Sequence, residues 1–178
     1  IVAGLTSVKE RSRHAFINDQ WFGNGCQGII DHTIGTGITP NSQAPDQDFR
    51  AAVAERWHRW VDRSDLDGVT DFGGQQAAAM QSVVVDGESY IHMAVTEAGE
   101  LRLRNLSTDQ LDVSLSRDLG NGVVIVNGIE FTNGVRSGFY IRPMTGPWLT
   151  PAATSIRVDA SEVCQVFRPP FVGAVHGI

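Results

Sequence analysis

The side chains best suited to acid–base or hydrolytic chemistry are a few histidines and closely spaced carboxylates. His58 and Asp62 stand four residues apart, the spacing that places two side chains on one face of a helix. Asp86 and Glu88 flank a glycine, so their two carboxylates could work together as an acid–base pair. One hypothesis is therefore a small hydrolase with a site around His58, Asp62 and Glu88.

Each of these groups also has a structural interpretation. His58 and Asp62 lack the His-Glu-x-x-His pattern of a metal site, and a surface salt bridge explains them as well. Asp86 and Glu88 suit a turn and a strand edge, which we favour because turns commonly contain such residues. The sequence has no Gly-x-Ser-x-Gly elbow and no Cys-His signature. We therefore expect no enzyme, no catalytic residue, no metal site and no cofactor.

Composition narrows the class of protein further. The chain has 178 residues, of which 42% are apolar and 19% charged, so it is long and apolar enough for one globular domain. Its two cysteines, Cys26 and Cys164, give neither a disulfide framework nor zinc spacing, which favours a reduced, cytoplasmic setting. No apolar run approaches the roughly 20 residues of a membrane span. The chain opens on Ile1 without a Met, and we interpret it as part of a longer protein.

The candidate residues lie before or within a boundary, Asp86 to Met93, which we call the seam. Before it, Gly74 to Val85 carries apolar residues at three- and four-residue spacing, which predicts a helix. From Ser89 the apolar period drops to two, which predicts a strand. Gly87 is expected to end the helix and turn the chain, because glycine takes a positive φ without a Cβ clash.

The first half of the chain predicts about three helices. Residues 1–9 are expected to be a frayed lead-in, and a helical pattern then runs from Glu10 to Ile34. Gly35 and Gly37 predict the end of that helix, because glycine commonly follows the last turn of a helix as its C-cap. Their turn lacks the lysine and the long spacing of a phosphate-binding loop, so no nucleotide site is expected there. Gln47 to Arg63 is the clearest helix.

An apolar stripe on the Gln47 to Arg63 helix contains two tryptophans. Trp57 and Trp60 could form a stacking platform for a nucleic-acid base. We expect them instead to be anchors in the core or in a subunit contact, because a buried tryptophan supplies a large contact area. Charged residues cover the opposite, solvated side of the helix: Arg50, Glu55, Arg56, Arg59 and Asp62.

The second half predicts short antiparallel strands. Two Asn-Gly pairs at 127–128 and 133–134 are strong signals of type I′ hairpins, so a three-stranded meander is expected over 123–142. Further strands near Ser155–Val158 and at Val163–Phe167 should complete the sheet, followed by an extended tail. Five glycines are expected to make structural turns: Gly35, Gly37, Gly87, Gly128 and Gly134.

The expected fold class is α+β, with about three N-terminal helices packed on a mainly antiparallel sheet. We expect one domain over residues 1–178. Its helical part should cover about 10–85 and its β-rich part about 88–168.

Several short pieces of sequence follow one another across nearly the whole chain. None is specific alone, but their order and spacing resemble the lambda family of bacteriophage portal proteins. The chain departs from the family pattern at Gln165, Ala174 and His176, where the family tends to have His, Gln and Arg. The pieces are Arg11-Ser12-Arg13 through Asn18, Gly35-Thr36-Gly37-Ile38, Trp57-x-x-Trp60, Asp86-Gly87-Glu88, Gly128-Ile129-Glu130-Phe131 with Arg136 and Tyr140-Ile141, and Val163 to Pro169 running to Gly173, Gly177 and Ile178.

This resemblance implies a structural role. Portal proteins form a homo-oligomeric ring, usually a dodecamer, at one capsid vertex, and DNA is packaged and ejected through it. Terminase, capsid and head–tail connector proteins are the implied partners, and the ATPase lies in the terminase. The implied location is the portal vertex of the virion, with host cytoplasm during assembly. The chain would be the N-terminal wing region of a subunit, without the stem, clip and crown.

Two other hypotheses remain beside the portal one: the small hydrolase described above and another ring-forming head–tail adaptor. No membrane partner is expected. DNA would pass through the full ring, but we expect this chain not to bind it. The 14 Lys and Arg residues face 20 Asp and Glu, a net charge of −6. The nearest basic cluster in the sequence is Arg102, Arg104 and Arg117.

Overall fold

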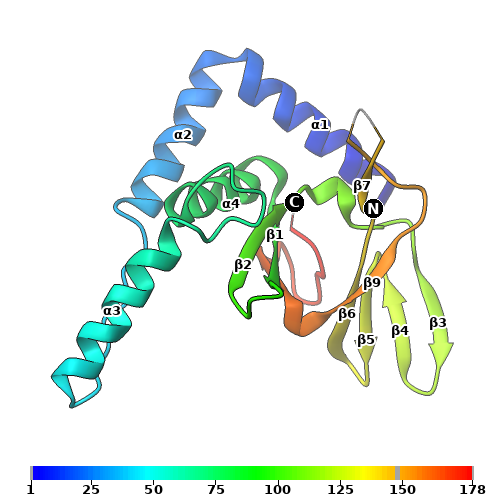
Figure 1. Ribbon diagram of the computed structural model, residues 1–178. Coiled ribbons are helices and arrows are strands. Elements are labelled where there is room, and N and C mark those ends of the chain that lie inside the picture. The colour runs from blue at the N-terminus through cyan, green and yellow to red at the C-terminus, as the bar shows by residue number, and fades with distance from the viewer. Residues whose placement is uncertain (1, 147–148, 178) are drawn as a thin grey trace.

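The computed structural model describes residues 2–146 and 149–177 and has an α+β architecture. In these residues four helices precede a series of antiparallel strands (Figure 1). The expected fold class is confirmed, with four helices instead of about three. Ile178, at the end of the portal-like pattern, lies outside the described residues.

The first two helices are α1 (Val2–Asn18) and α2 (Gln20–Ile34). The expected frayed lead-in over residues 1–9 was wrong, because residues 2–9 form the first half of α1. The expected continuous helix is divided at Asp19, whose side chain accepts backbone hydrogen bonds at 2.9 and 3.1 Å and caps α2. The chain changes direction at this cap (Figure 1).

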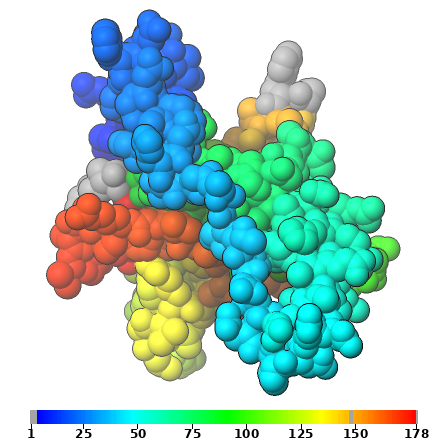
Figure 2. Space-filling model, turned by 90° about the vertical axis from the view of Figure 1, so that its left-hand side faces the viewer, coloured from blue at the N-terminus to red at the C-terminus, as the bar shows by residue number. Residues whose placement is uncertain are grey.

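The next helices, α3 (Gln47–Val61) and α4 (Phe72–Asp86), have different surroundings. α4 lies against α1, α2 and the first strand and buries three of its residues. α3 extends away from the body, and each of its residues is exposed or half-buried (Figure 1). Figure 2 shows α2 and α3 as separate lobes of one face, joined by residues 35–46.

The seam leads directly into the central strand of a three-stranded sheet. Its order is β10-β1-β2, with both pairings antiparallel. Tyr90 therefore lies between Gln165 on one side and Leu106 on the other. The strands are β1 (Glu88–Val95), β2 (Leu101–Leu106) and β10 (Val163–Phe167).

A five-stranded sheet has the order β3-β4-β5-β6-β9. The expected meander over 123–142 is confirmed, and both Asn-Gly pairs have positive φ at both positions. The expectation of one sheet was wrong, because the 3₁₀ turn η2 (Ala160–Glu162) separates β9 from β10. The strands are β3 (Arg117–Gly120), β4 (Val123–Val126), β5 (Ile129–Thr132), β6 (Val135–Ile141) and β9 (Ile156–Asp159), with a small hairpin of β7 (Met144–Thr145) and β8 (Thr150–Pro151).

The hydrophobic core joins the two larger sheets. Tyr90 of β1 meets Phe139 of β6 edge-to-face, with their ring centroids 6.0 Å apart. The two sheets therefore form one body. The buried core residues are Tyr90, Leu111, Ile129, Phe139, Ile141 and Val163.

The C-terminal tail folds back onto the seam instead of remaining extended, so that expectation was wrong. His176 is buried, and Gly177 lies so close to Gly87 that an added Cβ would stand 1.8 Å from the Gly87 carbonyl oxygen. Glu88 holds the tail there, since its carboxylate accepts a hydrogen bond from the Gly177 N–H at 3.4 Å and lies 3.1 Å from His176 Nδ1.

Candidate functional site

Glu88 is the centre of a buried polar cluster at the seam. Its side chain is 1% exposed and forms a 2.9 Å ion pair with Lys9 of α1. Its other carboxylate oxygen accepts the Tyr90 hydroxyl at 2.8 Å and lies 3.1 Å from His176 Nδ1. Gln165 of β10 donates to the same oxygen at 3.3 Å. The cluster therefore ties together α1, two strands and the tail.

The surroundings of Glu88 hold it in its charged form. Burial by itself would raise its pKa, but the hydrogen bond with His176 and the charge of Lys9 outweigh burial and lower the pKa to about 2. Burial, followed by the Glu88 charge, raises the pKa of Tyr90 well above its ordinary value, so the phenol remains a donor. This arrangement is a buried ion cluster, not an exposed acid–base site, although Gln165 Oε1 within it has no hydrogen-bond partner in the described residues.

Asp86 belongs to a separate network. The two oxygens of its carboxylate accept hydrogen bonds from Arg13 at 2.7 and 2.8 Å, and Thr108 donates at 3.0 Å. Asp86 and Glu88 are therefore not a catalytic pair. The strand-edge interpretation of Glu88 was also wrong, because β1 is the central strand and Glu88 faces inward with Tyr90.

The residues of the hydrolase hypothesis are not brought together. His58 and Asp62 lie exposed on or just after α3. The hydrogen bonds of the Glu88 side chain within residues 2–146 and 149–177 join it to Lys9 and to partners from the β-rich part and the tail. The three side chains therefore do not form a shared site in the described chain.

Sequence reasoning missed Lys9, Gln165 and His176 as partners of Glu88. Strand alternation was an available signal, because it puts Glu88 on the same face as Tyr90. Alternation could not identify the partners, because they are distant in the sequence. Lys9 lies 79 residues before Glu88, and Gln165 and His176 lie 77 and 88 residues after it. Gln165 and His176 are two of the positions that depart from the portal pattern, and both contact this carboxylate.

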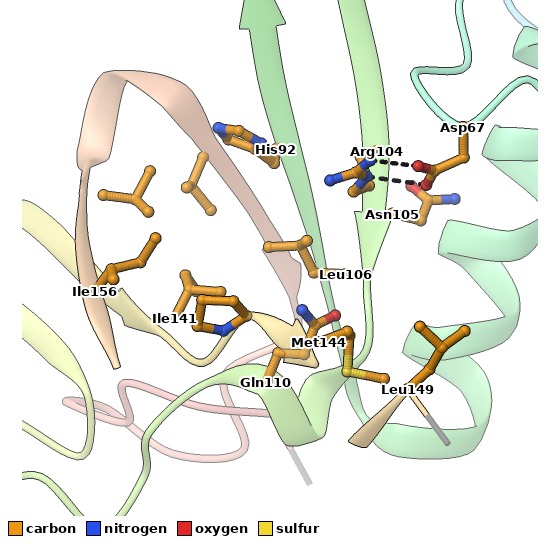
Figure 3. Close-up of a pocket in the computed structure, with 13 residues that line it drawn as sticks. Asp67, His92, Arg104, Asn105, Leu106, Gln110, Ile141, Met144, Leu149 and Ile156 are labelled. Atoms are coloured by element: carbon orange, nitrogen blue, oxygen red, sulfur yellow. Dashed lines mark hydrogen bonds and ion pairs between the residues drawn. The ribbon is translucent and has the colours of Figure 1, made fainter. Parts of the chain in front are cut away.

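A cavity of about 540 Å³ lies between the two main sheets. Figure 3 shows apolar side chains, including Ile141 and Leu106, along one part and polar groups along another. Arg104 and Asp67 form an ion pair at the polar end, and His92 lies near it. This lining can hold an apolar side chain beneath a polar rim, but it offers no nucleophile hydrogen-bonded to a base.

The described part of the chain has neither a cluster of metal ligands nor a helix that could span a membrane. Among residues 2–146 and 149–177, no three His, Cys, Asp or Glu side chains gather as metal ligands would. None of the helices described is both long and apolar enough to cross a membrane.

The tryptophans of α3 form an aromatic cluster with Phe72 of α4. Ring-centroid distances within it are 5.0, 5.4 and 5.1 Å, and the Trp60 indole donates to the Leu101 carbonyl at 2.7 Å. Trp57 and Trp60 are half-buried. Phe49, farther along the stripe, is 56% exposed. The cluster attaches one end of α3 to the body and leaves the rest of its apolar stripe in solvent.

The five glycines expected at turns all have positive φ. Gly87 is the left-handed C-cap of α4 at φ 84°, and its N–H donates to the Val83 carbonyl. Gly35, Gly37, Gly128 and Gly134 have φ of 55°, 80°, 82° and 81°.

Comparison with known proteins gives two kinds of match. Zinc finger protein 618 of Mus musculus is 28% identical over 132 residues, which are 70% of this chain. Its Homo sapiens counterpart is 27% identical over the same share. The chain spans only 14% of the length of these curated relatives.

The other match covers every residue. The family described as "Phage portal protein, lambda family" matches residues 1–178. This match agrees with the order of the sequence pieces from α1 to the tail. The chain therefore belongs to the lambda family of phage portal proteins.

Proposed function

We propose that this chain is the N-terminal wing region of a portal subunit and acts as a structural module in the ring at the capsid vertex. The portal family is structural. The observation that carries the proposal is the open helical half, since a monomer has little reason to leave so much apolar surface in water. Large exposed side chains on α1, α2 and α3 include Ile17, Trp21, Phe22, Ile29 and Phe49.

The rest of the proposal concerns how the module works. The Glu88 cluster fixes α1 to the β-rich body, so the helices project from a defined base. Trp57 would anchor a contact with the next subunit, and Trp60 would hold α3 against the body through its hydrogen bond to Leu101. The turn glycines would shape the connections. Capsid, terminase and head–tail connector proteins would bind the complete ring, which would package and eject DNA in the virion.

Electron microscopy of the full-length protein tests this function. We expect a closed ring with an axial hole and with this chain at its outer rim. The 178-residue chain alone should not form a stable closed ring at micromolar concentration in light scattering, because the proposed wing region does not include the stem. Full-length protein that stays monomeric, or that places this chain along the channel, would contradict the proposal. A ring with a head–tail adaptor's architecture would favour that alternative.

A further inference from the structure

A second cavity, of about 520 Å³, lies between α3 and the hairpin that joins β1 to β2. Four arginines line it together with one carboxylate, Glu100. Trp60 and Leu101 add apolar surface. We call this site the arginine groove, with the arginines Arg56, Arg59, Arg63 and Arg102.

The groove is formed by tertiary structure, not by a run of basic residues. The hydrogen bond from Trp60 to Leu101 fixes the end of α3 beside β2 and so brings Arg102 to the α3 arginines. Of the nearest basic cluster in the sequence, Arg102, Arg104 and Arg117, only Arg102 lines this groove. Arg104 pairs with Asp67 at the other cavity, and Arg117 belongs to the five-stranded sheet.

Part of the positive charge in the groove is free to bind a ligand. Arg102 pairs with Glu100 at 2.6 Å, and Arg59 forms a 3.4 Å pair with Glu55 in which both side chains are about 70% exposed. Arg56 and Arg63 form no ion pair within residues 2–146 and 149–177. The site is therefore cationic in a chain whose net charge is −6.

We propose that the arginine groove binds an acidic polypeptide segment of a partner protein, with two or three carboxylates beside one apolar side chain. A guanidinium offers a planar pair of N–H donors that matches a carboxylate, which makes arginine well suited to this contact. Trp60 and Leu101 provide the surface for the apolar side chain. The proposal is independent of ring formation.

The size and charge of the groove favour a short peptide over duplex DNA. A duplex carries one charge per roughly 1.7 Å, and stable binding commonly uses about 6–10 phosphate contacts. Two free arginines in a groove of this volume cannot supply them, and the negative charge of the whole chain repels a long polyanion. Two or three carboxylates match what the groove offers.

Fluorescence anisotropy tests the proposal with the 178-residue chain and a labelled peptide, Gly-Glu-Glu-Phe-Glu-Gly. A peptide with Gln in place of each Glu is the neutral control, and a duplex of about 20 base pairs is the nucleic-acid control. We expect saturable binding of the acidic peptide only. The double variant Arg56→Gln, Arg63→Gln should weaken that binding about tenfold, through two lost charge-assisted contacts.

A matched variant separates local recognition from net charge. Arg11→Gln with Arg168→Gln removes the same charge from exposed residues outside the groove. It should change the peptide affinity less than about twofold, since surface charges at a distance are screened by salt. Equal weakening by both double variants, or no peptide binding at about 1 mM, would overturn the proposal. Duplex binding that exceeds peptide binding and falls steeply between about 50 and 200 mM salt would replace it with a nucleic-acid interface.

Discussion

The seam and the α3 helix each contain a Glu-to-cation ion pair, but in opposite environments. Lys9 and Glu88 have side chains 9% and 1% exposed, whereas Arg59 and Glu55 are 69% and 70% exposed. Removing one partner from a buried pair leaves a desolvated charge, while an exposed charge simply returns to water. The seam is therefore a structural joint, whereas the charged face of α3 is free for other contacts.

Apolar side chains show the same contrast. In the β-rich body Tyr90 and Phe139 are almost fully buried, whereas Trp21 of α2 is 90% exposed. The body therefore has a core of its own, and the outer helices have surface that suits association with another protein.

The largest expected effect is the loss of the buried carboxylate. Glu88→Gln should destabilise the chain by about 3–5 kcal/mol, because Lys9 remains buried without its counter-charge. Glu55→Gln is the matched change on α3 and should cost less than about 0.5 kcal/mol. Urea unfolding of both variants measures the difference. Similar midpoints would show that the seam pair is no stronger than the surface pair.

The buried Glu88 carboxylate should also make the stability of the chain depend on pH, unlike the exposed Glu55. Because the folded pKa of Glu88 is about 2, below its ordinary value of 4.5, its contribution to stability is fully present above about pH 4.5. This stabilisation, about 3 kcal/mol in total, is lost as the pH falls through 2. Urea midpoints from pH 6 down to 2 should fall less steeply in Glu88→Gln than in Glu55→Gln. Parallel curves would contradict this assignment.

The third prediction concerns the half-buried tryptophan. Trp57→Ala should cost the isolated chain about 1–2 kcal/mol, because only part of its area is removed from water. The same truncation at the core residue Phe139 should cost clearly more. In the full-length protein, Trp57→Ala should reduce the fraction of assembled rings seen by electron microscopy. Normal assembly would refute the subunit-contact role of α3.

The smallest expected effect tests the turn between the two regions. Gly87→Ala should destabilise by about 1 kcal/mol, because alanine at φ 84° is strained. Gly25→Ala, in the middle of α2 with open space around its Cβ position, should instead stabilise by up to about 1 kcal/mol. Thermal unfolding of both variants shows whether each substitution lowers or raises the stability of the chain. A neutral result at Gly87 would mean that the helix end relaxes easily.

Local patterns were sufficient for much of the fold. The Asn-Gly pairs predicted the meander because a type I′ turn needs positive φ at adjacent residues, which is a property of the turn residues themselves. Local patterns failed at Asp19, because the helical spacing of apolar residues continues past this residue although the helix itself ends there and a new one begins. They also failed for the tail, whose position depends on Glu88, a residue about 90 positions away.

The sequence by itself determined the α+β class, the change from helices to strands at the seam, the turn at Gly87 and the resemblance to the portal family. These properties depend on neighbours within a few residues or on motif order along the chain. Only the tertiary structure decided that Glu88 meets Lys9 and His176, that the strands divide into two main sheets, and that Arg102 joins the arginines of α3. The physical reason is that burial and electrostatic pairing depend on distance in space, and packing sets these distances between residues that are far apart in the chain.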